Sequence, residues 1–365
     1  MITLIGATGF TGTLIAHEIH RLGISARLAA RDEHKLERLN AEAGGCFDLA
    51  TVDVTDPASV ERALDGASVV INCAGPFTDL GEPVVSRAVR RGIHYVDTTG
   101  EQGFIKTVYD KYDDEARSNG IALVPACAFE YALGDAATGL AVGTPAQCDS
   151  LEITYSATGI GMSRGTKKSV IRAMSSDAFR YRDGKLVKQR PGENSVTVEI
   201  PGVGKRKAYS FPGGEVLMAP RHIEVRDVTT FMVFGVPRFV LASVERVAAL
   251  ASGSAFERWL VRRIDRGSFG PSPKERQRTL FTIVCAARRG NQSRTVTVAG
   301  RDPYGITAAV AVRVASILEH GDARSLGGVS PSMVAGAQPL IEETERLGVK
   351  WDLGEWKNRN SIPST

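Results

Sequence analysis

The sequence predicts an α/β protein that begins with a doubly wound parallel sheet and continues into a mixed second domain. Three observations carry this prediction. Short apolar runs alternate with amphipathic helical stretches over the first 145 residues, which is typical of strand–helix–strand units. A glycine-rich turn follows the first of these runs. Beyond residue 146, apolar and polar residues alternate, which favours antiparallel strands.

The first strand, turn and helix predict a dinucleotide site. Residues 2–5 form an apolar run, and apolar residues recur at helical spacing over 10–22. The turn between them consists of Gly6, Ala7, Thr8, Gly9, Phe10, Thr11 and Gly12. Such glycines permit a tight turn, close approach of the pyrophosphate and close packing of helix on strand, while the helix N-terminus faces the phosphates. The alternative is a glycine turn without a ligand.

The end of the second strand, residues 25–30, favours NADP(H) over NAD(H). Arg31 follows this strand and Lys35 lies one helical turn further on. An arginine here accommodates a 2′-phosphate, whereas an acidic residue binds the free ribose hydroxyl of NAD. In the alternative, Arg31 is only solvated and Asp32, which also suits a helix N-cap, binds the ribose. Asp53 ends the third strand, where it either meets the adenine amino group or caps the next helix.

The fourth strand stops where the order of a doubly wound sheet reverses, which is the usual ligand crevice. The stop consists of Cys73, Ala74, Gly75, Pro76 and Phe77, small residues for the most part, against which the cofactor ribose and nicotinamide can lie. We interpret Cys73 as a core residue rather than a nucleophile, because nothing nearby in sequence activates it. The next strand and loop place Tyr95, Asp97 and Glu101 at the same edge, either for the substrate or for structural hydrogen bonds.

Composition excludes several classes of protein. The net charge of +4 over 365 residues does not indicate nucleic-acid binding. Five cysteines without a C-x-x-C pair predict neither a disulfide framework nor a metal site, and they suit a reducing cytoplasm. The sequence shows no signal peptide and no apolar stretch of membrane-spanning length. We therefore expect a cytoplasmic protein without a membrane span.

We expect three parts in the chain. Residues 1–145 form the Rossmann domain, 146–302 an α+β domain, and 303–365 helices that return to the Rossmann domain. Helices are predicted at 165–174, 236–264, 306–318 and 333–347. Tyr181 and Lys185 have the Tyr-x-x-x-Lys spacing of short-chain dehydrogenases, but the Asp183-Gly184 turn signal between them favours a hairpin over a helix.

Several motifs together resemble the saccharopine dehydrogenase-like oxidoreductases. In the first domain they are the glycine turn, Leu28–Arg31, Ile71–Phe77 and His94–Asp97. The later stretches Gly159–Thr166, Tyr181–Lys185 and Asp302–Thr307 are similar to the branch that contains the trans-acting enoyl reductases. The resemblance is weakest between residues 186 and 278. It implies NADP(H), an inserted substrate domain that often makes dimer contacts, and hydride transfer to a C=N or C=C bond.

The resemblance also implies that the segment after the sixth strand faces the nicotinamide. Related proteins carry a Gly-Phe-Asp-Ser-x-Pro type of segment there, whereas this chain has Glu130 and Tyr131 among apolar residues, which argues against an amino-acid substrate. We predict Tyr131 or a water as the proton donor, with Glu130 and Tyr95 as further catalytic candidates. Glu130 otherwise holds a cationic substrate amine or caps the helix that begins there.

Two predictions concern the second domain. The segment 163–166 binds an anion through its N–H groups and Arg164, or it is an ordinary helix start. Basic clusters around the apolar run 231–241 suggest docking of an acidic carrier that holds an acyl substrate, or else they are solvated charges around a core or dimer helix. A catalytically silent NADP sensor or scaffold is the rival to an oxidoreductase, because fold alone does not fix function.

Overall fold

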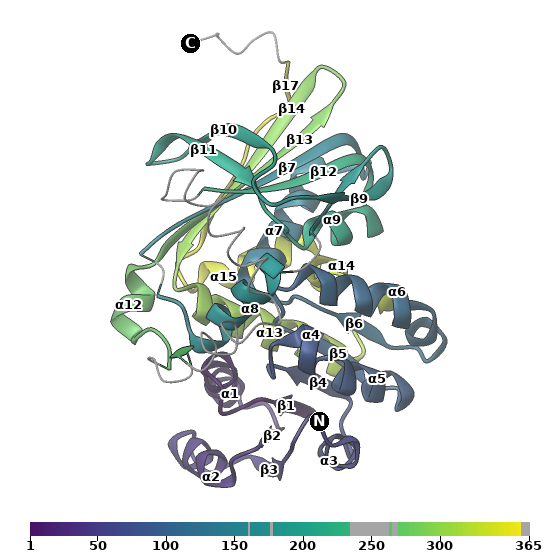
Figure 1. Cartoon of the computed structure of the whole chain (residues 1–365), viewed down its shortest axis with the longest axis vertical. Coiled ribbons are helices and arrows are strands. Elements are labelled where there is room, and N and C mark those ends of the chain that lie inside the picture. The colour runs from purple at the N-terminus through teal and green to yellow at the C-terminus, as the bar shows by residue number, and fades with distance from the viewer. Residues whose placement is uncertain (160, 176–177, 234–262, 265–268, 359–365) are drawn as a thin grey trace.

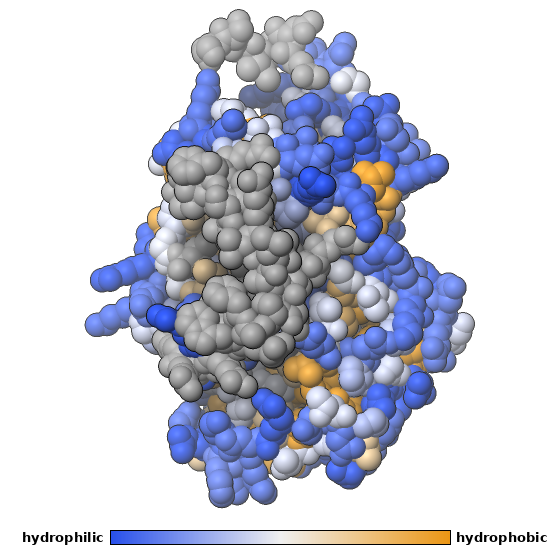
Figure 2. Space-filling view, in the orientation of Figure 1, coloured by the Kyte–Doolittle hydropathy of each residue, from blue (hydrophilic) through white to orange (hydrophobic). Residues whose placement is uncertain are grey.

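Two sheets organise the molecule, one in each half of the view in Figure 1. The structure is a computed structural model that describes residues 1–159, 161–175, 178–233, 263–264 and 269–358, with only the backbone described for 170–175. Polar and charged side chains cover the outer edges of both halves, and hydrophobic side chains show near α4 of the first (Figure 2). Among the described residues, no helix is both long enough and apolar enough to cross a membrane.

The first sheet has seven parallel strands in the order β15-β6-β5-β4-β1-β2-β3. Its strands are β1 (Ile2–Ile5), β2 (Ala26–Ala30), β3 (Asp48–Thr51), β4 (Val69–Asn72), β5 (His94–Asp97), β6 (Ala122–Val124) and β15 (Gly327–Gly328). This order reverses between β1 and β4, so the predicted doubly wound fold class is confirmed. The seventh strand was not predicted, because two glycines carry no apolar pattern.

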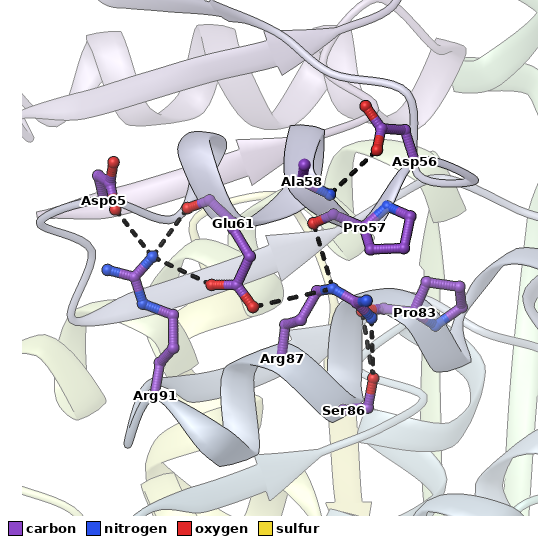
Figure 3. Close-up of polar contacts among 9 residues, drawn as sticks. All are labelled: Asp56, Pro57, Ala58, Glu61, Asp65, Pro83, Ser86, Arg87 and Arg91. Atoms are coloured by element: carbon purple, nitrogen blue, oxygen red, sulfur yellow. Dashed lines mark hydrogen bonds and ion pairs between the residues drawn. The ribbon is translucent and has the colours of Figure 1, made fainter.

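Helices follow the strands of this sheet in turn. They are α1 (Phe10–Arg21), α2 (Glu33–Glu42), α3 (Pro57–Ala63), α4 (Phe77–Leu80), α5 (Glu82–Arg90) and α6 (Gln102–Ser118). As predicted, Asp32 caps α2 by accepting a hydrogen bond from the Lys35 N–H. Ion pairs join α3 to α5: Arg91 binds Asp65 at 2.8 Å and Glu61 at 3.4 Å, and Arg87 reaches Glu61 at 3.9 Å (Figure 3).

The second sheet has the order β10-β11-β12-β7-β13-β14-β16, with a β8–β9 hairpin and β17 off this path. Its elements are β7 (Gln147–Thr158), α8 (Arg164–Ser175), β8 (Ala178–Arg182), β9 (Lys185–Gln189), β10 (Ser195–Ile200), β11 (Gly204–Ser210), α9 (Glu215–Met218), η1 (Ala219–Arg221), β12 (Glu224–Met232), α12 (Pro273–Arg278), β13 (Leu280–Arg289), β14 (Gln292–Arg301), β16 (Lys350–Leu353) and β17 (Lys357–Asn358). Asp183 and Gly184 both have positive φ, the requirement of a type I′ turn, so Tyr181 and Lys185 flank a hairpin as predicted.

Helix α7 (Phe129–Val142) links the two sheets. It follows β6 of the first sheet and packs against β7, β13 and β14 of the second, as well as against the C-terminal helices. Small residues let neighbouring side chains approach this helix closely: those of Glu215 and Tyr155 at Gly134, and that of Ala337 at Gly139. Arg289 and Arg294 donate hydrogen bonds to carbonyls at its C-terminal end, which suits the negative end of the helix dipole.

The C-terminal part returns to both sheets. Helix α13 (Pro303–His320) packs on α1 and against β4 and β5. The single helix predicted over 333–347 is instead two helices, α14 (Pro331–Ala335) and α15 (Ala337–Glu345), because Gly336 between them adopts φ of +87°. The helices predicted over 236–264 and the apolar run 231–241 lie for the most part outside the described residues.

Candidate cofactor and substrate site

The glycine turn has the geometry that a bound pyrophosphate requires. A Cβ at Gly6, whose φ is +80°, would lie 2.8 Å from the carbonyl carbon of Cys73. A Cβ at Gly12 would lie 2.2 Å from the Gly6 carbonyl oxygen, so only glycine lets α1 pack this closely on the turn. Gly9 is the N-cap of α1 and provides no side-chain acceptor, which leaves the first N–H groups to meet an anion.

Charged residues lie where the adenosine half of the cofactor would bind. Arg31 is exposed directly after β2. The Asp32 carboxylate is engaged by its own helix, since it also pairs with the Lys35 ammonium at 2.8 Å. Asp53 accepts from the Thr55 N–H at 2.9 Å and hydroxyl at 2.8 Å. These hydrogen bonds, with a smaller contribution from the Arg31 charge, hold the pKa of Asp53 below its usual range.

The stop after β4 lies beside the glycine turn. The Cys73 N–H donates to the Ile5 carbonyl at 2.8 Å, and the Ala74 N–H donates to Asn72 Oδ1 at 3.0 Å. Burial raises the pKa of the Cys73 thiol to about 12, which keeps it protonated and agrees with the interpretation of Cys73 as a core residue. The first N–H of α4, that of Phe77, donates to Glu101 at 3.0 Å.

Tyr95 lies in the core of the first domain. Its side chain is fully buried, and its hydroxyl accepts a hydrogen bond from Asn72 Nδ2 at 3.3 Å. Asp97 is also fully buried and accepts from the N–H groups of Thr99 and Ala126, each at 2.8 Å. Burial raises the pKa of Asp97 to about 7. These side chains fix the loops at the carboxyl edge of the sheet, and Tyr95 has no exposed surface in this structure.

Glu130 and Tyr131 differ in accessibility although they are adjacent at the start of α7. Tyr131 is 1% exposed, and its hydroxyl donates to the carbonyls of Gly100 at 3.4 Å and Pro212 at 3.3 Å. Glu130 is partly exposed, and its Oε1 lies 3.8 Å from the place of a Cβ on Gly100. Burial raises the pKa of Glu130 to about 7. The Phe129 N–H at the helix start is bound by Thr307 Oγ1 at 3.0 Å.

Two further acidic groups lie around α7: Asp135, which the sequence placed within reach of the crevice, and Glu215, to which the sequence did not point. Asp135 pairs with His222 at 2.7 Å and accepts from the Ser332 N–H at 3.0 Å. Burial raises the pKa of Asp135, but the His222 charge and the hydrogen bonds from His222, Ser330 and Ser332 together outweigh this and hold the pKa below its usual range. Glu215 is fully buried, and among the described residues neither of its carboxyl oxygens has a hydrogen-bond partner. Burial raises its pKa well above the ordinary value.

The predicted anion segment of the second domain lies against the glycine turn. Ser163 Oγ caps α8 by accepting from the Thr166 N–H at 3.1 Å. The Tyr304 hydroxyl accepts from the Ser163 N–H at 2.9 Å, and the Tyr304 ring packs edge-on against Phe10 with centroids 4.9 Å apart. Tyr304 belongs to the Asp302–Thr307 motif, so this motif was the feature of the sequence that could have identified Tyr304 as a site residue.

Residues 2–134 match the family model of the saccharopine dehydrogenase NADP binding domain. A saccharopine dehydrogenase-like oxidoreductase of Bos taurus is 28% identical over 58% of this chain and 52% of that protein. A trans-acting enoyl reductase of Mycobacterium ulcerans is 33% identical over 35% of this chain and 32% of that protein. The chain thus spans about half or a third of the length of these two relatives.

Two similarities extend over nearly the whole chain. A relative from Arabidopsis thaliana, described as a probable mitochondrial saccharopine dehydrogenase-like oxidoreductase, is 24% identical over 96% of each chain. Apo saccharopine dehydrogenase (L-Glu forming) from Saccharomyces cerevisiae covers 97% of this chain and 99% of its own, with a TM-score of 0.61 and 15% identity, which shows a shared fold. The predicted resemblance and the cofactor NADP(H) are confirmed. The cytoplasmic location stays a prediction.

Proposed function

We propose that this saccharopine dehydrogenase-like, NADP(H)-binding chain is an oxidoreductase that transfers a hydride to or from a C=C or C=N bond. The substrate is a small molecule or an acyl group. One observation carries the proposal: the Glu130 carboxyl lies at the carboxyl edge of the first sheet, beside Gly100, with a pKa of about 7. Among the described residues, no other side chain forms a hydrogen bond or an ion pair with the Glu130 carboxyl.

The chemistry divides between cofactor and protein. NADPH, when bound, supplies the hydride that adds to one atom of the substrate double bond. The other atom gains the bond's electron pair and needs a proton, and Glu130, half protonated near neutral pH, can donate it. In the reverse direction the same carboxylate accepts the proton. Tyr131 positions the loop at Gly100 through its hydroxyl, which already donates to two carbonyls.

The names of two relatives favour these bond types. An enoyl reductase acts on a C=C bond, and the yeast protein of similar fold is a saccharopine dehydrogenase. Glu130 and Tyr131 stand where related proteins carry small polar residues, which favours an apolar or acyl substrate over an amino acid. Docking of an acidic carrier and formation of a homodimer stay predictions.

Replacing the carboxyl tests this proposal. We expect Glu130→Gln to lower kcat by about 10²–10⁴-fold and to leave the affinity for NADPH unchanged, because only the proton donor is lost. The measurement is NADPH oxidation at the nicotinamide absorbance band across acceptors with C=C and C=N bonds. Glu33→Gln, a change in the first turn of α2, is the matched control.

The pH dependence adds a second readout. Wild-type reduction should decline as pH rises through about 7, where Glu130 loses its proton, and the Gln variant should lack this limb. Full activity of Glu130→Gln would remove Glu130 from the mechanism. Tight NADPH binding without oxidation by any acceptor would instead favour the NADP sensor.

Arg31 is proposed to bind the 2′-phosphate. We expect Arg31→Ala to weaken NADPH binding by about 10- to 100-fold, since a hydrogen-bonded charge contributes about 1.5–3 kcal/mol, while NADH binding changes little. Fluorescence titration with both cofactors measures this, with the exposed Arg38→Ala on α2 as control. Equal losses for NADPH and NADH would contradict the assignment.

A further inference from the structure

Glu101 connects the two domains beside the stop after β4. It is 2% exposed, and four donors bind its carboxylate. Phe77 N–H at 3.0 Å and Ser169 hydroxyl at 2.8 Å bind Oε1, while Thr78 N–H at 2.8 Å and Thr78 hydroxyl at 2.6 Å bind Oε2. Charge-assisted hydrogen bonds of this kind compensate the buried charge. One carboxylate therefore holds the start of α4 and helix α8 of the second domain at the same time.

The N-terminal end of α8 is held one helical turn before Ser169, by Tyr304. The Tyr304 hydroxyl lies 2.9 Å from Thr166 Oγ1 and accepts from the Ser163 N–H, while its ring rests on Phe10 of the glycine turn. A Cβ on Gly270 would lie 2.3 Å from the Phe10 ring, so the second domain also contacts this turn directly. Helix α8 lies between the two sheets (Figure 1). Within one helical turn it contacts Tyr304, which packs on the glycine turn, through Thr166, and Glu101, which binds the start of α4, through Ser169.

The neighbouring residue, Gln102, binds a different part of the second domain, namely β8 and the loop at Gly213. Gln102 accepts from the Phe179 N–H at 2.7 Å and donates to the carbonyls of Phe179 at 3.1 Å and Gly213 at 2.7 Å. All three partners are backbone groups, and Gln102 is 3% exposed. In contrast, Glu101 and Tyr304 hold α8 mainly through the hydroxyls of Ser169 and Thr166 and one N–H group. The hydroxyl contacts of α8 can therefore open while the Gln102 anchor stays closed.

We propose that Glu101 is a positioning residue that holds α8 over the cofactor crevice through Ser169, and that NADP(H) enters and leaves when α8 separates from Glu101 and Tyr304. A dinucleotide bound along the glycine turn and the stop after β4 would lie beside both of the elements to which α8 is held. Few hydrogen bonds need to break for α8 to separate from Glu101 and Tyr304, so the open arrangement is accessible in solution. This inference concerns cofactor exchange and does not depend on the reaction proposed for Glu130.

Stopped-flow fluorescence of NADPH with the full chain tests it. We expect Ser169→Ala and Tyr304→Phe each to raise both the association and the dissociation rate, by about 2- to 12-fold for each hydrogen bond lost. Ser169→Ala removes one hydrogen bond that holds α8, and Tyr304→Phe removes two. The Kd should change much less than either rate. Ser86→Ala on α5, whose hydroxyl binds a carbonyl of its own helix, is the matched control and should leave both rates unchanged.

The association and dissociation rates together distinguish this positioning role from a direct contact with NADPH. A lost contact with NADPH itself would raise the dissociation rate alone, and that result in both variants would overturn the proposal. Unchanged rates in both variants, with a Tm equal to that of the wild type, would overturn it as well. Gln102→Ala should lower the Tm instead, since it removes the backbone anchor of the second domain.

Discussion

Two regions of this molecule that contain charged side chains differ in burial and in how their charges are compensated. On the surface, Glu61, Asp65, Arg87 and Arg91 join α3 to α5, and each charge has an oppositely charged partner and contact with water (Figure 3). Around α7, by contrast, Asp135 and Glu215 are fully buried and Glu130 is partly exposed, and among the described residues Asp135 alone of these three has a charged partner. Exposed pairs contribute little to stability because water competes for them, whereas a buried carboxyl without a partner lowers stability.

The difference indicates where function is to be found. Perturbed pKa values are common at functional sites, and the raised pKa of Glu130 supports the role that we propose for this carboxyl. The surface cluster has no such requirement, since α3 and α5 would pack in its absence. Substitutions in the two regions therefore test whether burial or charge alone determines how much a charged side chain contributes to the free energy of unfolding.

The largest effect is expected at the buried ion pair. Asp135→Ala should destabilise the fold by about 3–5 kcal/mol, because it leaves His222 without the carboxylate that compensates its charge. Urea denaturation at pH 6 measures the loss. A loss below about 1 kcal/mol would mean that this buried pair contributes no more to stability than an exposed pair, and it would contradict the difference between the two regions.

The same pair predicts how stability depends on pH. The pKa of Asp135 is lowered from 3.8, so its contribution is present above that value and is lost as pH falls through the folded pKa. The pKa of His222 is raised from 6.5, despite burial, by the Asp135 charge, so its contribution is present below 6.5 and is lost as pH rises through the folded pKa. Asp135→Ala should remove the second dependence.

A smaller effect is expected where the buried carboxyl Glu215 meets α7. A Cβ at Gly134 would lie 2.0 Å from Glu215 Oε1 and 2.4 Å from the Tyr155 hydroxyl oxygen. Gly134→Ala should therefore destabilise by about 1–3 kcal/mol through overpacking, although alanine favours a helix. Gly103→Ala on α6, where nothing lies within 4 Å of the new Cβ, is the control and should stabilise by about 0.5–1 kcal/mol. Equal shifts in Tm would contradict the crowding at Gly134.

The smallest effect is expected in the surface cluster. Arg91→Ala removes the pairs to Asp65 and Glu61 and a hydrogen bond to the Glu61 carbonyl, yet should cost only about 0–1 kcal/mol. Thermal unfolding at low and high salt measures it, and the small difference between variant and wild type should shrink as salt screens the charges. A loss as large as that of Asp135→Ala would show that exposure does not weaken these pairs.

Local chemistry explains why the sequence predicted the first domain well. Strand, glycine turn and helix are short-range patterns, and Gly6 and Gly12 are required where a Cβ would meet backbone within 3 Å. The prediction that β4 stops at Cys73 also depends on a short-range pattern, an apolar run that ends in small residues. The break at Gly336 was missed, because the apolar spacing continues across it while the backbone does not.

The sequence by itself determined the doubly wound sheet and the cofactor NADP(H), since the patterns that predict them consist of residues near one another in the chain. Only the tertiary structure decided which polar groups meet. Glu101 and Ser169 are 68 positions apart in the sequence, and Asp135 and His222 are 87 positions apart. No local sequence pattern predicts contacts between residues this far apart. The burial that raises the pKa of Glu130 to about 7 likewise depends on the packing of α7 between two sheets, which no local pattern contains.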